Sequence, residues 1–186
     1  NKVNNFIMDS REVREGDCFV AIKGENNNGN KFLEMALEKG ASVCLIDEEP
    51  EENLIKKYNN RTIIKVTDTI KAIQEIAKYK RSLYDIPVVA VTGSVGKTST
   101  KDIIASVLSK QYNVLKTEGN FNNHIGLPMT LLQLKDHTAV VVEMGMNHFN
   151  EIRVLTNIAK PTVAVITNIG TSHIGNLGSR ENILKA

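Results

Sequence analysis

The sequence predicts an α/β protein in which a small N-terminal α/β domain precedes a second domain with a mostly parallel sheet. Short runs rich in β-branched residues alternate with helical patterns along the first part of the chain. The later strands are apolar at consecutive positions, as strands buried on both faces are. A glycine-containing loop then joins one of these strands to a helix, which is typical of a P-loop-type domain.

The N-terminal domain is predicted from three β-rich runs and two helical patterns. The strands are expected at residues 18–22, 43–46 and 62–66, and the helices at residues 32–39 and 69–83. A polar, glycine-containing stretch at residues 26–30 indicates a turn or a binding loop.

The second of these helices has a clear start, a polar face and a clear end. Asp68 can cap its first turn. The cluster of Lys78, Lys80 and Arg81 falls largely off the apolar stripe and is expected on a solvated face. Pro87 and the residues before it break the helix, because the residue preceding a proline disfavours the α region. We therefore place the domain boundary there, with residues 1–85 in the first domain and 86–186 in the second.

The second domain is expected to hold buried strands at residues 88–91, 139–142 and 163–166, separated by helical segments. Its last run, residues 179–186, has a helical pattern without a closing signal, and the chain begins without methionine. Both features predict a truncated chain whose P-loop-type domain is incomplete.

Composition excludes several classes of partner. The 186 residues carry 23 basic and 21 acidic side chains with the signs mixed, which does not favour nucleic acid or an anionic membrane. No apolar run approaches the roughly 20 residues of a membrane helix. Cys18 and Cys44 have neither metal-ligand nor redox spacing and are expected to be buried thiols. These features predict a cytoplasmic protein, and we expect a monomer.

The strongest functional motif is the loop after the strand at residues 88–91. Its glycines let several backbone N–H groups point at one anion, and the N-terminus of the following helix adds a favourable dipole. A standard P-loop carries one more glycine, where this chain has Val91, so the loop is a variant. The predicted phosphate-binding residues are Gly93, Ser94, Val95, Gly96, Lys97, Thr98 and Ser99.

Within this loop Lys97 is expected to reach the outer phosphates and the Thr98 hydroxyl to bind Mg²⁺. Glu143 ends a buried strand at the edge where open α/β sheets bind ligands, so it can supply a second oxygen ligand. His173 follows the next strand. A histidine in such a loop is either a metal ligand or a residue that only hydrogen-bonds its neighbours.

Several segments together resemble the Mur ligases over nearly the whole chain. The matching stretches are DSR at 9–11, GD at 16–17, FVA at 19–21, the loop at 92–100, GNFNNHIGLP at 119–128, EMGMNH at 143–148, and TNIG at 167–170 followed by His173. The asparagine-rich stretch and residues 143–148 favour the member that adds D-alanyl-D-alanine over its tripeptide-forming relatives.

The resemblance implies an ATP-dependent amide ligase of peptidoglycan precursor synthesis. The γ-phosphate of ATP would pass to the terminal carboxylate of UDP-N-acetylmuramoyl-tripeptide, and the amine of D-alanyl-D-alanine would attack the acyl phosphate. Lys97, Glu143 and His173 would be the catalytic residues. Thr98 and Glu143 would hold one Mg²⁺ and His173 a second, and Lys97 would neutralise the phosphates.

The resemblance also implies substrate-binding residues. Ser10 and Arg11 would help to seat the uridine nucleotide, and Asn122 and Asn123 would line the substrate or nucleotide cleft.

The chain departs from the family in two respects. Asn28 and Asn30 stand where relatives commonly carry Asp and His. The family's carbamoylated lysine falls just beyond Ala186 in our alignment, and Lys185 is out of register for it. The chain alone is therefore expected to be inactive.

Two alternatives stay open. A different amide ligase, of the tripeptide-forming or folylpolyglutamate type, would share the loop but differ in the substrate domain. A P-loop nucleotide switch or binding module would also share it, although the sequence shows neither Asp-x-x-Gly after an apolar strand nor Asn-Lys-x-Asp.

Overall fold

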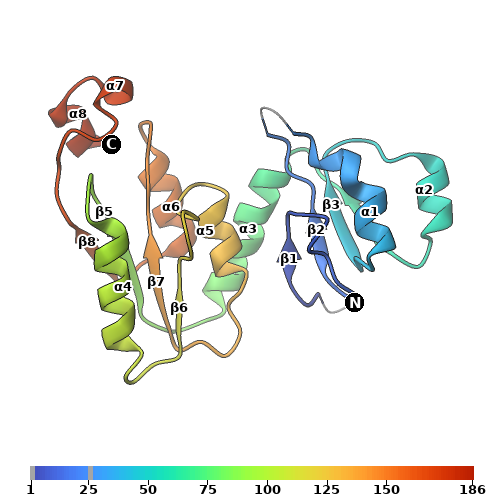
Figure 1. Cartoon of the computed structure of the whole chain (residues 1–186), viewed down its shortest axis with the longest axis horizontal. Helices are drawn as coiled ribbons and strands as arrows, with labels where there is room; N and C mark the ends of the chain where they lie inside the picture. The colour runs from blue at the N-terminus through green and yellow to red at the C-terminus, as the bar shows by residue number, and fades with distance from the viewer. Residues whose placement is uncertain (1–2, 25–26) are drawn as a thin grey trace. The chain divides into compact units, whose positions relative to one another are not determined.

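A computed structural model describes residues 3–24 and 27–186. The chain divides into two compact units, and the division falls between Ala72 and Ile73 in the sequence. Each unit contains one four-stranded sheet in which every neighbouring pair of strands is parallel (Figure 1). The predicted α/β class with mostly parallel sheets is confirmed.

The sheet of the first unit has the order β1-β2-β3-β4. Its elements are β1 (Phe6–Ile7), β2 (Cys18–Val20), the 3₁₀ turn η1 (Gly29–Phe32), α1 (Leu33–Glu38), β3 (Val43–Ile46), α2 (Glu52–Lys57), β4 (Thr62–Lys65) and the first turn of α3 (Thr69–Ser82). The three predicted strands and both helices are present, whereas β1 and α2 are too short to stand out in the sequence pattern. The predicted loop at 26–30 includes Asn26, which lies outside the described residues.

The core of the first unit lies between α1 and the sheet. Phe19 and Ile46 from the strands pack in one cluster with Leu33 and Leu37 of α1. Cys18 and Cys44 are free and buried, as predicted. Burial raises the pKa of each thiol to about 12, so neither is a reactive thiolate at neutral pH.

The sheet of the second unit has the order β6-β7-β5-β8. Its elements are β5 (Val88–Thr92), α4 (Lys97–Leu108), β6 (Val114–Lys116), α5 (Gly126–Leu131), β7 (Ala139–Glu143), α6 (Glu151–Ala159), β8 (Val163–Ile166), α7 (Ile174–Leu177) and α8 (Arg180–Lys185). β5 lies between β7 and β8, so the strand that carries the glycine loop is central.

The order of the strands places the main helices on opposite faces of this sheet. The connection from β5 to β6 crosses the sheet in one direction, and the connection from β7 to β8 crosses it in the other. Because such crossovers are right-handed, α4 and α6 must cover different faces. Ala105 of α4 packs on Val89, Val91 and Val141. The carboxyl ends of β5 and β7 therefore meet at a point where the direction of winding changes, which is where open α/β sheets bind ligands.

The prediction of a solvated basic face on α3 is wrong for Lys80 and Arg81, whereas Lys78 is exposed as predicted. Only 7% of Arg81 is exposed, and its Nε donates to the carbonyl oxygen of Ala159 at 3.0 Å. Nζ of Lys80 donates to the carbonyl oxygen of Leu132 at 2.5 Å. The second unit needs donors for carbonyl groups at the ends of its helices, and long basic side chains on α3 supply them.

These contacts explain why the compact units divide within α3. Gln74 and the two basic residues all bond to residues of the second unit, whereas Thr69 donates to the carbonyl oxygen of Ala21 in the first. The domain boundary placed after residue 85 stays a prediction.

Other local predictions can be compared directly. The Asp68 carboxylate accepts a hydrogen bond from Lys71 N, as expected of a cap. Ser179 caps α8 by accepting from Asn182 N. Ile103 and Val107 of α4 are exposed. Within residues 3–24 and 27–186, no helix is long and apolar enough to cross a membrane.

Candidate functional site

The glycine loop turns the chain from the end of β5 into α4, as the sequence predicts. Gly93 and Gly96 have φ angles of 133° and 82°, which residues with a Cβ rarely adopt. A Cβ on Gly93 would also collide with Thr167 and the backbone of Asn168. The two glycines therefore permit both the turn and the close approach of the segment after β8.

The start of α4 presents unpaired donors. Among the residues that the structure describes, the backbone N–H groups of Gly96, Lys97, Thr98 and Ser99 have no protein acceptor. This is the usual condition of the first turn of a helix, and it favours an anion there. Nζ of Lys97 donates to the carbonyl oxygen of Gly93 at 2.8 Å, so its charge is held over the same loop. Ser94 and Val95, in contrast, use their N–H groups inside the protein.

Glu143 ends β7 beside the glycine loop, in register with Val91 of β5. Only 3% of the residue is exposed. Its Oε2 accepts a 2.8 Å hydrogen bond from the Thr98 hydroxyl, and its Oε1 accepts one of 2.8 Å from Nδ2 of Asn122. The structure thus brings together a buried carboxylate, a loop hydroxyl and an amide that were predicted from three separate segments.

Two further residues, Thr117 and Lys101, help to fix the position of Glu143 through hydrogen bonds. The backbone N–H of Glu143 donates to Oγ1 of Thr117 at 3.0 Å. The carbonyl oxygen of Thr117 accepts a 2.8 Å hydrogen bond from Nζ of Lys101, a lysine that is only 3% exposed. The sequence analysis did not select Lys101, although its spacing from Ile104, Ala105 and Leu108 places it on the inner stripe of α4.

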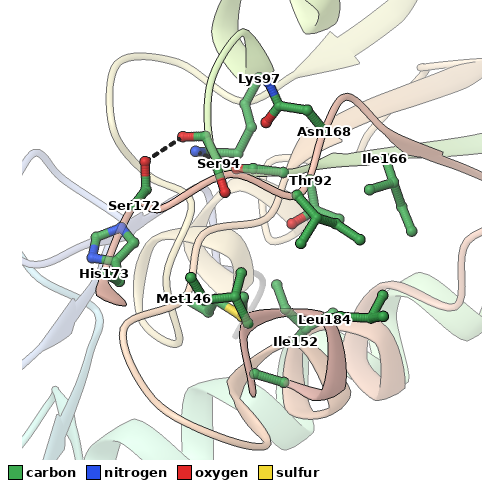
Figure 2. Close-up of a pocket in the computed structure, with 14 residues that line it drawn as sticks. Thr92, Ser94, Lys97, Met146, Ile152, Ile166, Asn168, Ser172, His173 and Leu184 are labelled. Atoms are coloured by element: carbon green, nitrogen blue, oxygen red, sulfur yellow. Dashed lines mark hydrogen bonds between the residues drawn. The ribbon is translucent and has the colours of Figure 1, made fainter. Parts of the chain in front are cut away.

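His173 lies on the loop after β8 and lines a pocket of about 130 Å³ with the glycine loop (Figure 2). One wall of this pocket is polar and includes Ser94 and Lys97. The facing wall in Figure 2 is apolar and includes Met146 and Ile152. His173 itself is exposed and has a left-handed backbone, φ 63°, at the start of α7. Its assignment as a metal ligand stays a prediction.

A second pocket of about 270 Å³ shares Lys97, Met146 and His173 with the first. Asn122 and Asn123 both line it. Their assignment to a substrate or nucleotide cleft stays a prediction. Asn123 also has a structural task, because its Oδ1 accepts hydrogen bonds from the N–H groups of Ile125 and Gly126 at the start of α5. The other residues of this pocket are Asn120, His124, Gly145, Asn147 and Glu151.

The first unit contains a separate pocket of about 470 Å³ that Ser10 and Arg11 line. Ser10 is buried, and its hydroxyl contacts Sδ of Met35 at 3.2 Å. Arg11 is exposed and binds both carboxylate oxygens of Asp9. The Arg11 guanidinium lowers the pKa of the Asp9 carboxyl to about 2, so this pair stays charged over a wide pH range.

The donor set around Glu143 suits a hard cation. Carboxylate and hydroxyl oxygens are the ligands that Mg²⁺ prefers. Within the described part of the chain, no three His, Cys, Asp or Glu residues form a group that could hold a metal ion. A magnesium site at Glu143 would therefore also need the Thr98 hydroxyl and an oxygen ligand from a bound molecule, such as a phosphate oxygen.

Comparison with known proteins agrees with this geometry. The model of the Mur ligase middle domain matches residues 91–186, and that of the Mur ligase family catalytic domain matches residues 2–81. The chain belongs to the Mur ligase family. The resemblance seen in the sequence is thereby confirmed.

Individual Mur ligases show how much of such a protein the chain covers. A UDP-N-acetylmuramoyl-tripeptide--D-alanyl-D-alanine ligase of Synechocystis sp. is 45% identical over 100% of this chain and 40% of its own length. A crystal structure of MurF from Acinetobacter baumannii superposes with a TM-score of 0.89 at 37% identity, over 99% of this chain and 40% of that one. MurF from Thermotoga maritima in complex with ADP gives a TM-score of 0.87 at 36% identity, over 98% and 41%. The chain thus spans about 40% of the length of the relatives it matches.

Proposed function

We propose that this chain supplies the nucleotide-sugar-binding and ATP-binding parts of a ligase that adds D-alanyl-D-alanine to UDP-N-acetylmuramoyl-tripeptide. Membership of the Mur ligase family supports the reaction class. Two bacterial relatives, 45% and 44% identical to this chain, are both named as ligases that join these two substrates, which supports the choice of substrates. Adenine nucleotide is supported by the MurF of Thermotoga maritima, whose structure contains ADP.

One observation carries the proposal: the open first turn of α4, Lys97 and the Thr98–Glu143 pair lie at the same edge of one sheet. Four N–H groups without an acceptor among the described residues, together with a lysine, suit the phosphates of ATP. The hydroxyl of Thr98 and the carboxylate of Glu143, 2.8 Å apart, suit Mg²⁺. Phosphoryl transfer depends mainly on this kind of positioning and charge neutralisation.

The chain's own residues have distinct tasks in this scheme. Lys97 exchanges the carbonyl oxygen of Gly93 for a phosphate oxygen, because a charged acceptor forms the stronger hydrogen bond. The amide of Asn122 keeps the Glu143 carboxylate oriented toward Thr98. A bound Mg²⁺ would neutralise charge that develops on the transferred phosphoryl group. His173 borders both pockets, which supports it as the ligand of a second Mg²⁺.

The two pockets that meet at Lys97 offer space for both reacting groups. The amide-rich pocket lined by Asn122 and Asn123 suits the peptide carboxylate that receives the phosphoryl group. In the first unit, the pocket of Ser10 and Arg11 suits the uridine diphosphate of the same substrate, because a guanidinium binds phosphate oxygens in pairs.

ATP titration of the Lys97→Ala variant by calorimetry tests the nucleotide site. A hydrogen bond to a charged group is worth about 1.5–3 kcal/mol, so affinity should fall by roughly tenfold to a hundredfold. Lys110→Ala is the matched control, since Lys110 lies exposed just beyond the other end of α4. Equal ATP affinity in the wild type and the Lys97 variant, with both folded, would rule out the phosphate loop.

Phosphate release by the full-length enzyme tests the substrates. We expect release that requires both UDP-N-acetylmuramoyl-tripeptide and D-alanyl-D-alanine. Release with a single amino acid in place of the dipeptide would instead indicate another amide ligase. Release that needs no amine acceptor and prefers GTP would indicate a nucleotide switch.

A further inference from the structure

The segment after β8 forms several hydrogen bonds with Ser94 and Val95 of the glycine loop. Three groups of Ser94 are engaged: its N–H by the carbonyl oxygen of Asn168, its hydroxyl oxygen by the N–H of Gly170, and its carbonyl oxygen by the hydroxyl of Ser172. The last of these bonds is drawn in Figure 2. We name residues 167–172 the clasp.

The clasp also holds both backbone groups of Val95. Its N–H donates to Oδ1 of Asn168 at 3.1 Å, and its carbonyl oxygen accepts a 2.6 Å hydrogen bond from Oγ1 of Thr167. Val95 is otherwise 60% exposed, so local packing does little to fix its peptide planes. Asn168 is therefore the one residue of the clasp that binds both Ser94 and Val95, through its carbonyl and its side chain.

The clasp divides the N–H groups of the loop into two sets. Those of Ser94 and Val95 point to Asn168, and those of Gly96 to Ser99 remain unpaired in the described structure. A phosphate can therefore be bound without breaking the clasp. This division also accounts for the variant motif, since the chain has Val91 where a standard P-loop has its first glycine and the loop from Gly93 to Gly96 is short.

We propose that Asn168 is a positioning residue of the phosphate site, which fixes the Ser94 and Val95 peptides so that the four N–H groups at the start of α4 converge on the nucleotide phosphates. The residues that follow β8 thus hold the short glycine loop in the conformation that a longer glycine loop adopts without such support. Preorganisation of this kind raises affinity by removing the entropy cost of ordering the loop on binding. The proposal rests on the phosphate site proposed above.

The clasp has a second consequence for the same site. His173 directly follows Ser172, whose hydroxyl is bonded to the carbonyl oxygen of Ser94. We expect a change in the shape of the glycine loop to shift Ser172 and, with it, His173. Because Asn168 fixes the Ser94 peptide, its loss would then also affect the start of α7.

Amide hydrogen exchange of the unliganded chain tests the clasp without nucleotide. Asn168→Ala removes the acceptor of Val95 N–H, so exchange at Val95 should become faster by about tenfold or more. Asn168→Asp keeps an acceptor oxygen at this position and should retain the slow exchange. Unchanged exchange at Val95 in the folded Ala variant, or equally fast exchange in the Ala and Asp variants, would overturn the proposal.

ADP titration tests the link to nucleotide binding. The loss of one preorganising hydrogen bond should weaken ADP binding by roughly threefold to tenfold in Asn168→Ala. In the full-length ligase the KM for ATP should rise by a similar factor while kcat changes less. The control is Asn176→Ala, an exposed asparagine of α7 whose side chain forms no hydrogen bond in the described structure.

The outcomes separate the two proposals. If the wild type binds no ADP, the proposed function fails, and the exchange measurement still decides the clasp. If the wild type binds ADP and Asn168→Ala binds it equally well, positioning by Asn168 is refuted. An equal loss in the Asn176 control would also refute it, because the effect would then be general destabilisation.

Discussion

The hydroxyl of Thr98 donates a 2.8 Å hydrogen bond to Oε2 of Glu143, which joins the first turn of α4 to the end of β7. The other oxygen of the same carboxylate accepts from Nδ2 of Asn122. A buried carboxylate needs such partners, because an unpaired charge in the protein interior is costly. The pair therefore keeps the two oxygen atoms that we propose as Mg²⁺ ligands close together without a cation.

Replacing Glu143 by Gln should keep the shape of this site and remove its charge. We expect the full-length enzyme to lose at least about tenfold in turnover, because charge neutralisation by a metal is worth several kcal/mol in the transition state. The Mg²⁺ concentration needed for half-maximal rate should rise as well. Turnover is measured across a Mg²⁺ titration with ATP in excess. Wild-type rates at every Mg²⁺ concentration would show that Glu143 holds no metal.

His173→Ala should affect chemistry more than binding. A neutral imidazole is a weak ligand for Mg²⁺, which prefers oxygen, so we expect turnover of the full-length enzyme to fall by roughly tenfold with ATP affinity little changed. Steady-state rates and ATP titration of the same variant separate the two effects. Normal turnover across a Mg²⁺ titration would leave His173 as a loop residue without a metal.

Local sequence was sufficient to predict the turn from β5 through the glycine loop into α4. Gly93 and Gly96 act through backbone conformation, and Lys97 and Thr98 follow them directly, so all four can be recognised within one short stretch. Their role in phosphate binding stays a prediction. Glu143 could be predicted as well, because the end of a buried strand defines its position at the edge of the sheet. In these cases the position of the residue in the fold follows from its own strand, loop or helix.

The residues that the sequence did not reveal depend on pairing between distant segments. Asn168 meets the glycine loop because β8 pairs with β5, and that partner cannot be deduced from the pattern of β8 alone. Two residues could have been found from helical spacing. Arg81 lies four residues after Ala77 and eight after Ile73, both buried, so its spacing already places it on the inner side of α3. Lys101 likewise lies on the inner stripe of α4.

Arg11→Ala should weaken binding of the uridine nucleotide without affecting ATP. Arg11 is exposed at a pocket of the first unit, so its removal should leave the fold intact. We expect the affinity for UDP-N-acetylmuramoyl-tripeptide to fall by roughly tenfold, the effect of losing one charged hydrogen bond. Calorimetry with each ligand separately measures this. Arg14→Ala is the control, because Arg14 is also exposed but does not line the pocket. Equal losses in both variants would mean that only the general charge of the unit matters.

Arg81→Ala should destabilise the second unit strongly, although Arg81 does not line the nucleotide pocket. The guanidinium donates to the carbonyl oxygens of Ala159 and Tyr84 at 3.0 and 2.6 Å, and its loss leaves these acceptors without their donor. Each unsatisfied buried group costs about 1–3 kcal/mol. Ala159 is buried but Tyr84 only half-buried, so we expect the free energy of unfolding to fall by about 2–4 kcal/mol. Urea denaturation followed by circular dichroism measures the change. Lys78→Ala on the same helix should shift the free energy by no more than about 0.5 kcal/mol, because its side chain is 46% exposed and pairs only weakly with Glu75. If the two variants unfolded at the same urea concentration, Arg81 would be the solvated residue that we expected from the sequence.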